Sequence, residues 1–317
     1  MADRKNEFAN ENARAMERIV AEAMALARSY PKEFETKLNT RRGAKLLMAA
    51  RMAEAKDLPF DLLEEPVLEA TAAGAGALMD SRPTGRQHYV ILDIGAGTTD
   101  VAGCICVKVD EDHVKVWEIQ NARSAKNLAG NILDNALRKY ILDSSSLANG
   151  SPEFEQADKA LRKTIRTEKE NLFRDGELQV DLVTDELVEV NLEDFLNQQS
   201  VRKVFDTIKE MVKKAAFAIN ERGSRVFLVP TGGGANLPIV DDLTAEPLEQ
   251  DGMRVRLELT NAMPELLQEA YPEIEPFYPQ LAVSIGGAHP ALPEQKASID
   301  HFEEDPGNKT LAPVYKS

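Results

Sequence analysis

Two glycine-rich segments, each placed directly after a run of apolar residues, constrain this chain more than any other feature. The first is "ILDIGAGTTD" at 91–100, and the second is "FLVPTGGGANLP" at 227–238. A short apolar run that ends in turn-forming residues is typical of a buried strand. Glycines at the end of a strand allow backbone N–H groups to face an anion, because no Cβ stands in the way. The pattern therefore predicts two loops that can approach a ligand with bare backbone.

The first segment combines groups that suit a phosphate and its cation. Gly95 and Gly97 free the backbone. Thr98 and Thr99 add hydroxyl donors, and Asp93 places a carboxylate beside them. A carboxylate next to an anion site is favourable when a cation lies between them, as Mg²⁺ does in nucleotide sites. The alternative is a strand that simply ends in a turn, because Asp and Gly are common turn residues.

The second segment suits a flatter group. Gly232, Gly233 and Gly234 remove side chains over a surface large enough for a ring or a sugar. Asn236 could hydrogen-bond that group, and Pro238 fits the first turn of a following helix. A flexible turn is the alternative. Neither segment matches the glycine spacing of a Rossmann dinucleotide site or of a P-loop.

Periodicity along the rest of the chain predicts long helices mixed with strands. Helical spacing of apolar residues predicts helices at 7–27, 38–55, 131–143, 151–173 and 201–219. Alternating or β-branched runs predict strands at 88–94, 98–109, 113–120, 225–229 and 254–259, and a hairpin at 176–192. Ser151 followed by Pro152 predicts a capped helix start. This mixture indicates an α/β protein.

Composition disfavours several classes of protein. The 53 acidic residues outnumber the 38 basic ones and give a net charge of −15, which argues against nucleic-acid or anionic-membrane surfaces as partners. The apolar runs are too short to cross a bilayer, and the polar start is unlike a signal peptide. Cys104 and Cys106 lie two apart on an expected strand, so they share a face and cannot easily pair. We expect reduced, buried thiols and a cytoplasmic location.

Several segments together resemble a known family. "ILDIGAGTTDV" resembles the second phosphate-binding hairpin of the actin-like ATPase superfamily, and "FLVPTGGGANLP" resembles its adenosine motif. Further segments resemble parts of the seventy-kilodalton heat-shock chaperones in the same order: "LEEPVLEATAAG", "AGNILDNAL", "TIRTEKENLF", "EVNLEDFL" and "AVSIGGA". The resemblance covers residues 28–290. It implies an actin-like ATPase (ribonuclease H-like) fold with an incomplete first lobe, and ATP or ADP with Mg²⁺ as ligands.

The resemblance also implies roles for individual residues. Asp93 would hold Mg²⁺ through water, and Glu65 would help to position the waters of the metal. The remaining positions would bind the nucleotide: Gly95, Ala96, Gly97, Thr98 and Thr99 at the phosphates, Gly232, Gly233, Gly234 and Asn236 at the nucleoside, and Gly130, Asp134, Arg166 and Lys169 on the upper side of the cleft. Each has an ordinary alternative, such as a solvated lysine for Lys169 or a favourable helix start for Glu65.

The chain departs from the family near its start. The family's first phosphate hairpin, an Asp-x-Gly-Thr stretch, is absent from the sequence, and the catalytic lysine that accompanies it is absent too. We therefore expect adenine nucleotide to bind weakly or not at all and hydrolysis to be negligible. The expected parts are N-terminal helices with a remnant of the first lobe (1–84), the second lobe (85–262, with an upper insertion at 126–200), a return helix (263–292) and a flexible tail (293–317).

Two functions follow from the resemblance. One is the ATP-binding lobe of a heat-shock-70-like chaperone or ATPase, whose partners would be an adenine nucleotide and a protein client or co-chaperone. The alternative is a structural module of the actin-like filament or cell-division type, because the stretch "DIGAGTTD" resembles proteins of that type as much as it resembles chaperones. A sugar or acetate kinase would need a residue set for a second substrate, which the motifs do not supply.

Overall fold

The computed structural model describes residues 2–30, 32, 40–54, 69–79, 85–108, 114–221 and 225–288. The chain divides into two compact units, 1–67 and 68–317, which we treat separately. The first unit contains α1 (Ala2–Ser29) and α2 (Thr40–Glu54), which confirms the helices predicted there. The predicted tail at 293–317 lies outside the described residues.

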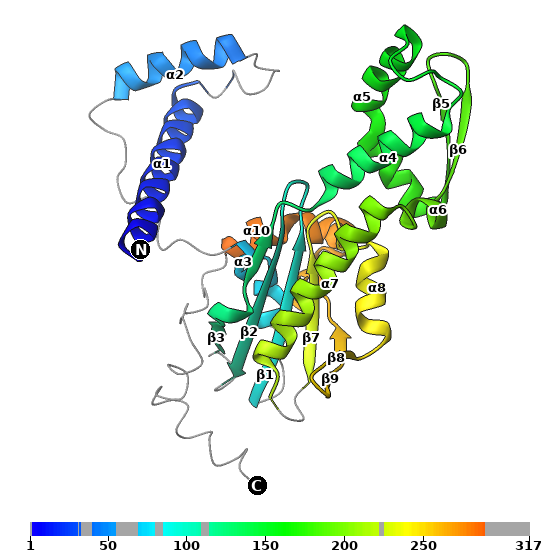
Figure 1. Ribbon diagram of the computed structural model, residues 1–317. Coiled ribbons are helices and arrows are strands. Elements are labelled where there is room, and N and C mark those ends of the chain that lie inside the picture. The colour runs from blue at the N-terminus through cyan, green and yellow to red at the C-terminus, as the bar shows by residue number, and fades with distance from the viewer. Residues whose placement is uncertain are drawn as a thin grey trace. The chain divides into compact units, whose positions relative to one another are not determined.

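A mixed sheet forms the centre of the second unit (Figure 1). Its main path runs β10-β7-β1-β2-β3, and β4 (Ser124–Lys126) also pairs with β2. The strands β1 (Gly85–Ile94), β2 (Thr99–Lys108) and β3 (Val114–Glu118) form an antiparallel meander. The strands β7 (Val226–Thr231) and β10 (Leu257–Leu259) are parallel to each other, and β7 is parallel to β1. The α/β class and the predicted strands other than the one at 254–259 are confirmed.

One predicted strand is wrong in its extent. The segment 254–259 divides into β9 (Met253–Val255), which pairs with β8 (Leu248–Gln250), and β10, which joins the main sheet. Asp251 and Gly252 connect β8 to β9 with φ values of 51° and 78°. Two successive positive φ angles are typical of the tight turn that closes a two-residue hairpin. The Asp-Gly pair therefore folds β9 back onto β8, whereas β10 pairs with β7 instead.

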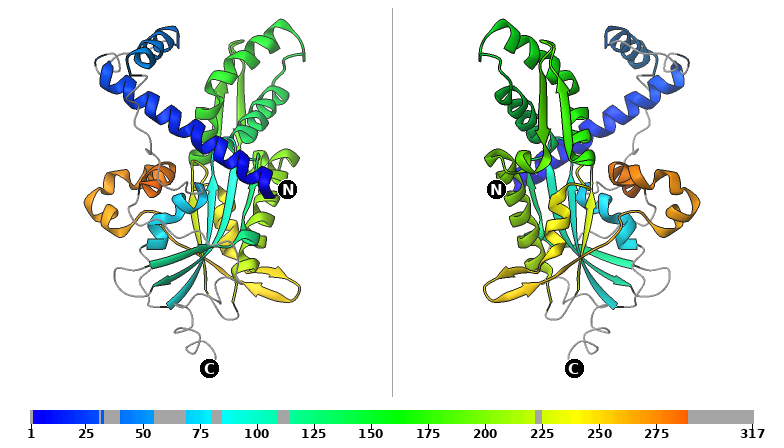
Figure 2. Two further views of the ribbon diagram at one scale, coloured as in Figure 1. Left: turned by 90° about the vertical axis from the view of Figure 1, so that its left-hand side faces the viewer. Right: turned by 90° about the vertical axis from the view of Figure 1, so that its right-hand side faces the viewer.

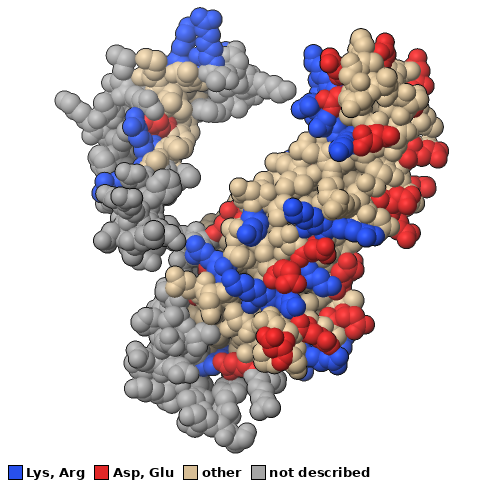
Figure 3. Space-filling view, in the orientation of Figure 1, with Lys and Arg blue, Asp and Glu red and all other residues tan. Residues whose placement is uncertain are grey.

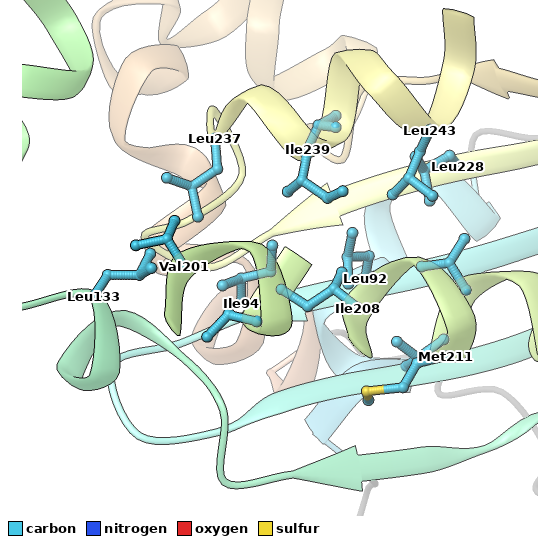
Figure 4. Packing of buried hydrophobic residues seen from close by; sticks show 14 of the residues in the cluster. Leu92, Ile94, Leu133, Val201, Ile208, Met211, Leu228, Leu237, Ile239 and Leu243 are labelled. Atoms are coloured by element: carbon cyan, nitrogen blue, oxygen red, sulfur yellow. The ribbon is translucent and has the colours of Figure 1, made fainter. Parts of the chain in front are cut away.

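Helices cover both faces of the sheet. On one face lie α7 (Gln199–Ile219) and α8 (Pro238–Ala245), and on the other lie α3 (Glu69–Met79) and α10 (Tyr278–Gly287), as Figure 2 shows. Side chains alternate along β1 accordingly, because successive residues of a strand point to opposite faces. Leu92 packs in the cluster with α7 and α8 (Figure 4), whereas Ile91 packs in the cluster with α3 and α10.

The expected insertion is a compact set of elements between β4 and α7. It comprises α4 (Gly130–Ser144), α5 (Pro152–Asp175), the hairpin of β5 (Glu177–Asp181) and β6 (Leu187–Asn191), and α6 (Leu192–Leu196). The predicted cap of α5 is confirmed, because Ser151 Oγ accepts a hydrogen bond of 3.1 Å from the N–H of Phe154. Asp185 turns the hairpin with a φ of 59°.

The remaining short elements connect these layers. They are the 3₁₀ helices η2 (Gln120–Ala122) and η3 (Pro272–Phe277) and the helix α9 (Glu265–Ala270). Cys104 and Cys106 are buried and form no disulfide, as predicted. Burial raises the pKa of the Cys104 thiol well above its usual range, so this thiol is inert at neutral pH.

The described helices give no candidate for a bilayer span, since none of them combines sufficient length with sufficient apolar character. On the face of the second unit that Figure 3 shows, Lys and Arg side chains lie among Asp and Glu side chains. Neither sign of charge dominates that face.

Candidate functional site

The cleft of interest lies where β1 and β7 end. These strands are parallel neighbours, but the chain continues from β1 to β2 on one side and from β7 toward β10 on the other. Such a divergence is the place where open α/β sheets bind ligands, at the carboxyl ends of the strands. A cavity of about 380 Å³ opens there, which falls within the usual size range of small-molecule sites.

The two glycine loops meet in this cleft. The N–H of Gly234 donates a hydrogen bond of 3.0 Å to the carbonyl oxygen of Ile94. Gly232 has a φ of 77°, and a Cβ on it would collide with the Asp93 carboxylate and the Ile94 carbonyl. Only glycine fits such a position without strain. The sequence prediction that the two loops approach a common ligand site is consistent with this geometry.

Several backbone donors of these loops remain available. The N–H of Gly95 bonds the Thr98 carbonyl at 2.9 Å and closes the hairpin. Within the described part of the chain, the N–H groups of Ala96, Gly97 and Gly233 bond no backbone acceptor. Free, neighbouring N–H groups in a turn form a concave site for anions.

Asp93 supplies a buried carboxylate at the floor of the cleft. Its residue exposure is 5 %, and its pKa is raised to about 6. Burial is the main cause, the negative charges of Glu69 and Asp100 add to it, and the Thr231 hydroxyl offsets part of the rise. A carboxylate held under such conditions is stabilised by a cation, because a nearby positive charge favours the ionised form.

A second carboxylate, Glu69, lines the cleft from the first turn of α3. The sequence indicated Glu65 for this role, but Glu65 lies outside the described residues. Glu69 is an acid in the first turn of α3, where the helix dipole favours negative charge.

The upper wall of the cleft comes from α4 and α5. The N–H groups of Gly130 and Asn131 donate to the carbonyls of Gly95 and Ala96 at 3.1 and 2.7 Å, so the start of α4 is tied to the hairpin after β1. Lys169 on α5 forms an ion pair of 2.6 Å with Asp134 on α4. Its Nζ also donates to the Gly130 carbonyl at 3.3 Å, which joins the two helices.

Most of the predicted residues line this cleft. Those that do so are Asp93, Gly95, Ala96, Gly130, Asp134, Arg166, Lys169, Gly232, Gly233 and Gly234. Four others, Gly97, Thr98, Thr99 and Asn236, are not among its lining residues. Thr99 is buried and donates to the Leu128 carbonyl at 2.5 Å, which gives this hydroxyl a structural role.

The sequence prediction missed residues that reach the cleft from elsewhere in the chain. Asn131, Glu170 and Gln280 line it with Glu69. The start of α10 is held there because the N–H of Gly232 donates to the Pro279 carbonyl at 2.7 Å. Pro279 lies in the first turn of α10, a position that suits proline, and the fold places this helix start against the glycine loop.

No family model and no curated protein matches this chain. Among the described residues, no three His, Cys, Asp or Glu side chains gather to hold a metal by themselves. A cation in this cleft would therefore rely on water and ligand oxygens as well, which is the usual coordination of Mg²⁺.

Proposed function

We propose that the cleft binds an adenine nucleotide together with Mg²⁺. The observation that carries the proposal is the hydrogen bond between Gly234 and Ile94, because it brings both glycine loops to one ligand site. The phosphates would lie over the turn at Gly95–Gly97, and the nucleoside would lie against Gly232–Gly234. The free N–H groups of Ala96 and Gly97 suit phosphate oxygens.

The residues present fit a magnesium ion. Asp93 and Glu69 offer carboxylates on the same cleft, and Mg²⁺ is commonly held by one or two carboxylates, waters and phosphate oxygens. The bound ion would supply positive charge that neutralises the phosphates. Asp93 would orient its waters, and the bare backbone at Gly232 keeps room for the Asp93 carboxylate.

In this proposal, residues of the upper wall of the cleft contact the nucleoside. Arg166 and Lys169 both line the cleft. Arg166 is exposed and pairs with Glu170 at 3.3 Å, so its planar guanidinium is free to stack on a base. Lys169 is instead held by Asp134, so we assign it to the shape of the wall and to contact with the ribose.

We further propose the actin-like ATPase fold and, within it, the nucleotide-binding lobe of a heat-shock-70-like ATPase. The resemblance of the two glycine loops supports this assignment, as do the segments that supply α4, α5 and α10. Phosphoryl transfer depends almost entirely on positioning and electrostatic stabilisation. The described residues provide one glycine hairpin for phosphates, so we expect weak nucleotide binding and negligible hydrolysis by this chain alone.

Backbone NMR of the full chain tests the proposal, because it detects weak binding at individual amides. We expect Mg-ADP at millimolar concentration to shift the amide signals of Ala96, Gly97 and Gly233. A matched addition of Mg²⁺ with adenosine should shift Gly233 alone. Unchanged signals at all three positions, with Mg-ADP and with Mg-ATP, would show that the cleft is not a nucleotide site.

Asp93→Asn is the companion variant, and Asp181→Asn on the exposed face of β5 is its control. Loss of the magnesium-dependent part of ADP binding is expected for Asp93→Asn alone. Equal binding by the two variants would remove Asp93 from the metal site.

A further inference from the structure

Thr231 carries a buried hydroxyl group that is not well satisfied by hydrogen bonds. It is the last residue of β7 and has a relative exposure of 0 %. Its Oγ1 lacks a hydrogen bond of good geometry, although the hydroxyl lies close enough to the Asp93 carboxylate to lower the pKa of that group. A buried hydroxyl without a good hydrogen bond destabilises the folded state, and folded proteins leave few such groups. The hydroxyl therefore points to a partner that forms in another state of the site.

The neighbour of this hydroxyl is Asp93. The register of the β1–β7 pair places Asp93 opposite Thr231, and residues that are paired across neighbouring strands point to the same face. The pair two residues earlier, Ile91 and Val229, points to the same face and packs on the side of the sheet that α3 and α10 cover. Asp93 reaches the cleft, whereas Thr231 does not line it. Thr231 thus lies behind the carboxylate, on the protein side.

We propose that Thr231 is a positioning residue for the cation, whose hydroxyl donates a hydrogen bond to the Asp93 carboxylate when a divalent ion is held in the cleft. This inference rests on the proposed function. Carboxylates that serve metals are usually hydrogen-bonded by a second layer of residues, and loss of such a partner typically lowers metal affinity 10- to 100-fold. Burial lets the single hydroxyl fix the carboxylate, because water does not compete for it.

The neighbouring residues limit which other groups could donate a hydrogen bond to the Asp93 carboxylate from the protein side. Gly232 has no side chain, and its N–H is already bonded to the Pro279 carbonyl. The offset that Thr231 contributes to the pKa of Asp93 agrees with a hydroxyl close to the carboxylate. Among the described residues, Thr231 is thus the group placed to donate from the protein side.

Thr231→Val and Thr231→Ser test the inference as a pair. Valine keeps the shape and removes the hydroxyl, whereas serine keeps the hydroxyl. The probe is Mn²⁺ alone, and electron paramagnetic resonance measures the free ion. We expect Thr231→Val to weaken Mn²⁺ binding by about 10- to 100-fold and Thr231→Ser to stay within a few-fold of the unchanged protein. Equal affinity of all three proteins would overturn the inference, and so would equal weakening by both variants.

Two further measurements keep the result interpretable. Urea unfolding without metal should show that Thr231→Val is as stable as the unchanged protein or more stable, because it loses an unsatisfied hydroxyl. ADP binding in the presence of chelator should be the same for all three proteins, since the hydroxyl acts only through the cation. Absence of Mn²⁺ binding by the unchanged protein would refute the role of Thr231. The proposed function itself would fail only if ADP also left the amides of Ala96, Gly97 and Gly233 unshifted.

Discussion

The carbonyl of Ile94 accepts a hydrogen bond from the N–H of Gly234 at 3.0 Å, and this contact joins the loop after β1 to the loop after β7. The two loops come from distant parts of the chain, yet both line one cleft with Asp93 between them. A site built this way depends on the parallel pairing of β1 and β7. Changes that disturb this pairing should therefore affect stability and ligand binding together.

Gly232→Ala should destabilise the protein. The position has a φ of 77°, and a left-handed conformation costs an L-residue about 1–2 kcal/mol. The added Cβ would also meet Asp93 and the Ile94 carbonyl. Urea unfolding should show that the free energy of unfolding falls by at least this amount. Gly233→Ala is the matched control, because nothing lies within 4 Å of its Cβ position, and we expect little change. Equal losses in the two variants would contradict the role assigned to Gly232.

Asp93→Asn should stabilise the ligand-free protein at neutral pH. The pKa of Asp93 rises from 3.8 to about 6 on folding, so the folded state binds the proton more tightly. The stabilisation that protonation provides is full below pH 3.8 and is lost as the pH rises through 6. Ionisation at pH 7.5 then costs about 2–3 kcal/mol, which asparagine avoids.

The pH dependence distinguishes the cost of ionising Asp93 from a stabilising effect of the substitution that does not depend on ionisation. Urea unfolding of Asp93→Asn should show the largest gain at pH 7.5 and about half of it at pH 5. A gain that stays constant between these two pH values would mean that ionisation of Asp93 does not oppose folding. Asp181→Asn, on the exposed face of β5, should change stability little at either pH.

Gly286→Ala should weaken the packing of α10 on α3. A Cβ at Gly286 would run into the carbonyl oxygen of Ala72, and forced overpacking typically costs about 1–3 kcal/mol. Gly287→Ala has open space at its Cβ position and serves as the control. Thermal unfolding should separate the two variants. If both variants had the same melting temperature, the close approach of α10 and α3 would not depend on Gly286.

The ion pair between Lys169 and Asp134 should couple α5 to α4. The two side chains are 13 % and 17 % exposed, so solvent screens them only in part. A double-mutant cycle with Lys169→Met and Asp134→Asn should give a favourable coupling energy of about 1 kcal/mol. Urea unfolding of the four proteins measures it. A coupling energy near zero would reduce the pair to a surface contact.

Cys104 and Cys106 should resist thiol reagents in the folded protein. Both are buried and form no disulfide, and burial raises the pKa of Cys104 well above its usual range. Ellman's reagent should detect no thiol in the native state and two after unfolding in guanidinium. Rapid reaction of the native protein would show that the face of the sheet under α3 opens readily.

Much of the local structure could be predicted because it depends on neighbours in the chain. The start of α5 follows from Ser151 and Pro152, and the apolar run before Asp93 follows the alternation of a buried strand. The segment 254–259 was mispredicted, because its alternating pattern runs through the whole segment, whereas β9 pairs with β8 and β10 pairs with β7.

The sequence by itself determined which residues could serve a ligand: glycines at strand ends, an aspartate between them, and hydroxyls beside it. Only the tertiary structure decided which of these share a cleft. It turned Thr99 into a buried structural contact, brought Glu69 and Gln280 to the cleft, and set Thr231 behind Asp93. The physical reason is that local preferences act over a few residues, whereas strand pairing and helix packing join residues that the chain keeps far apart.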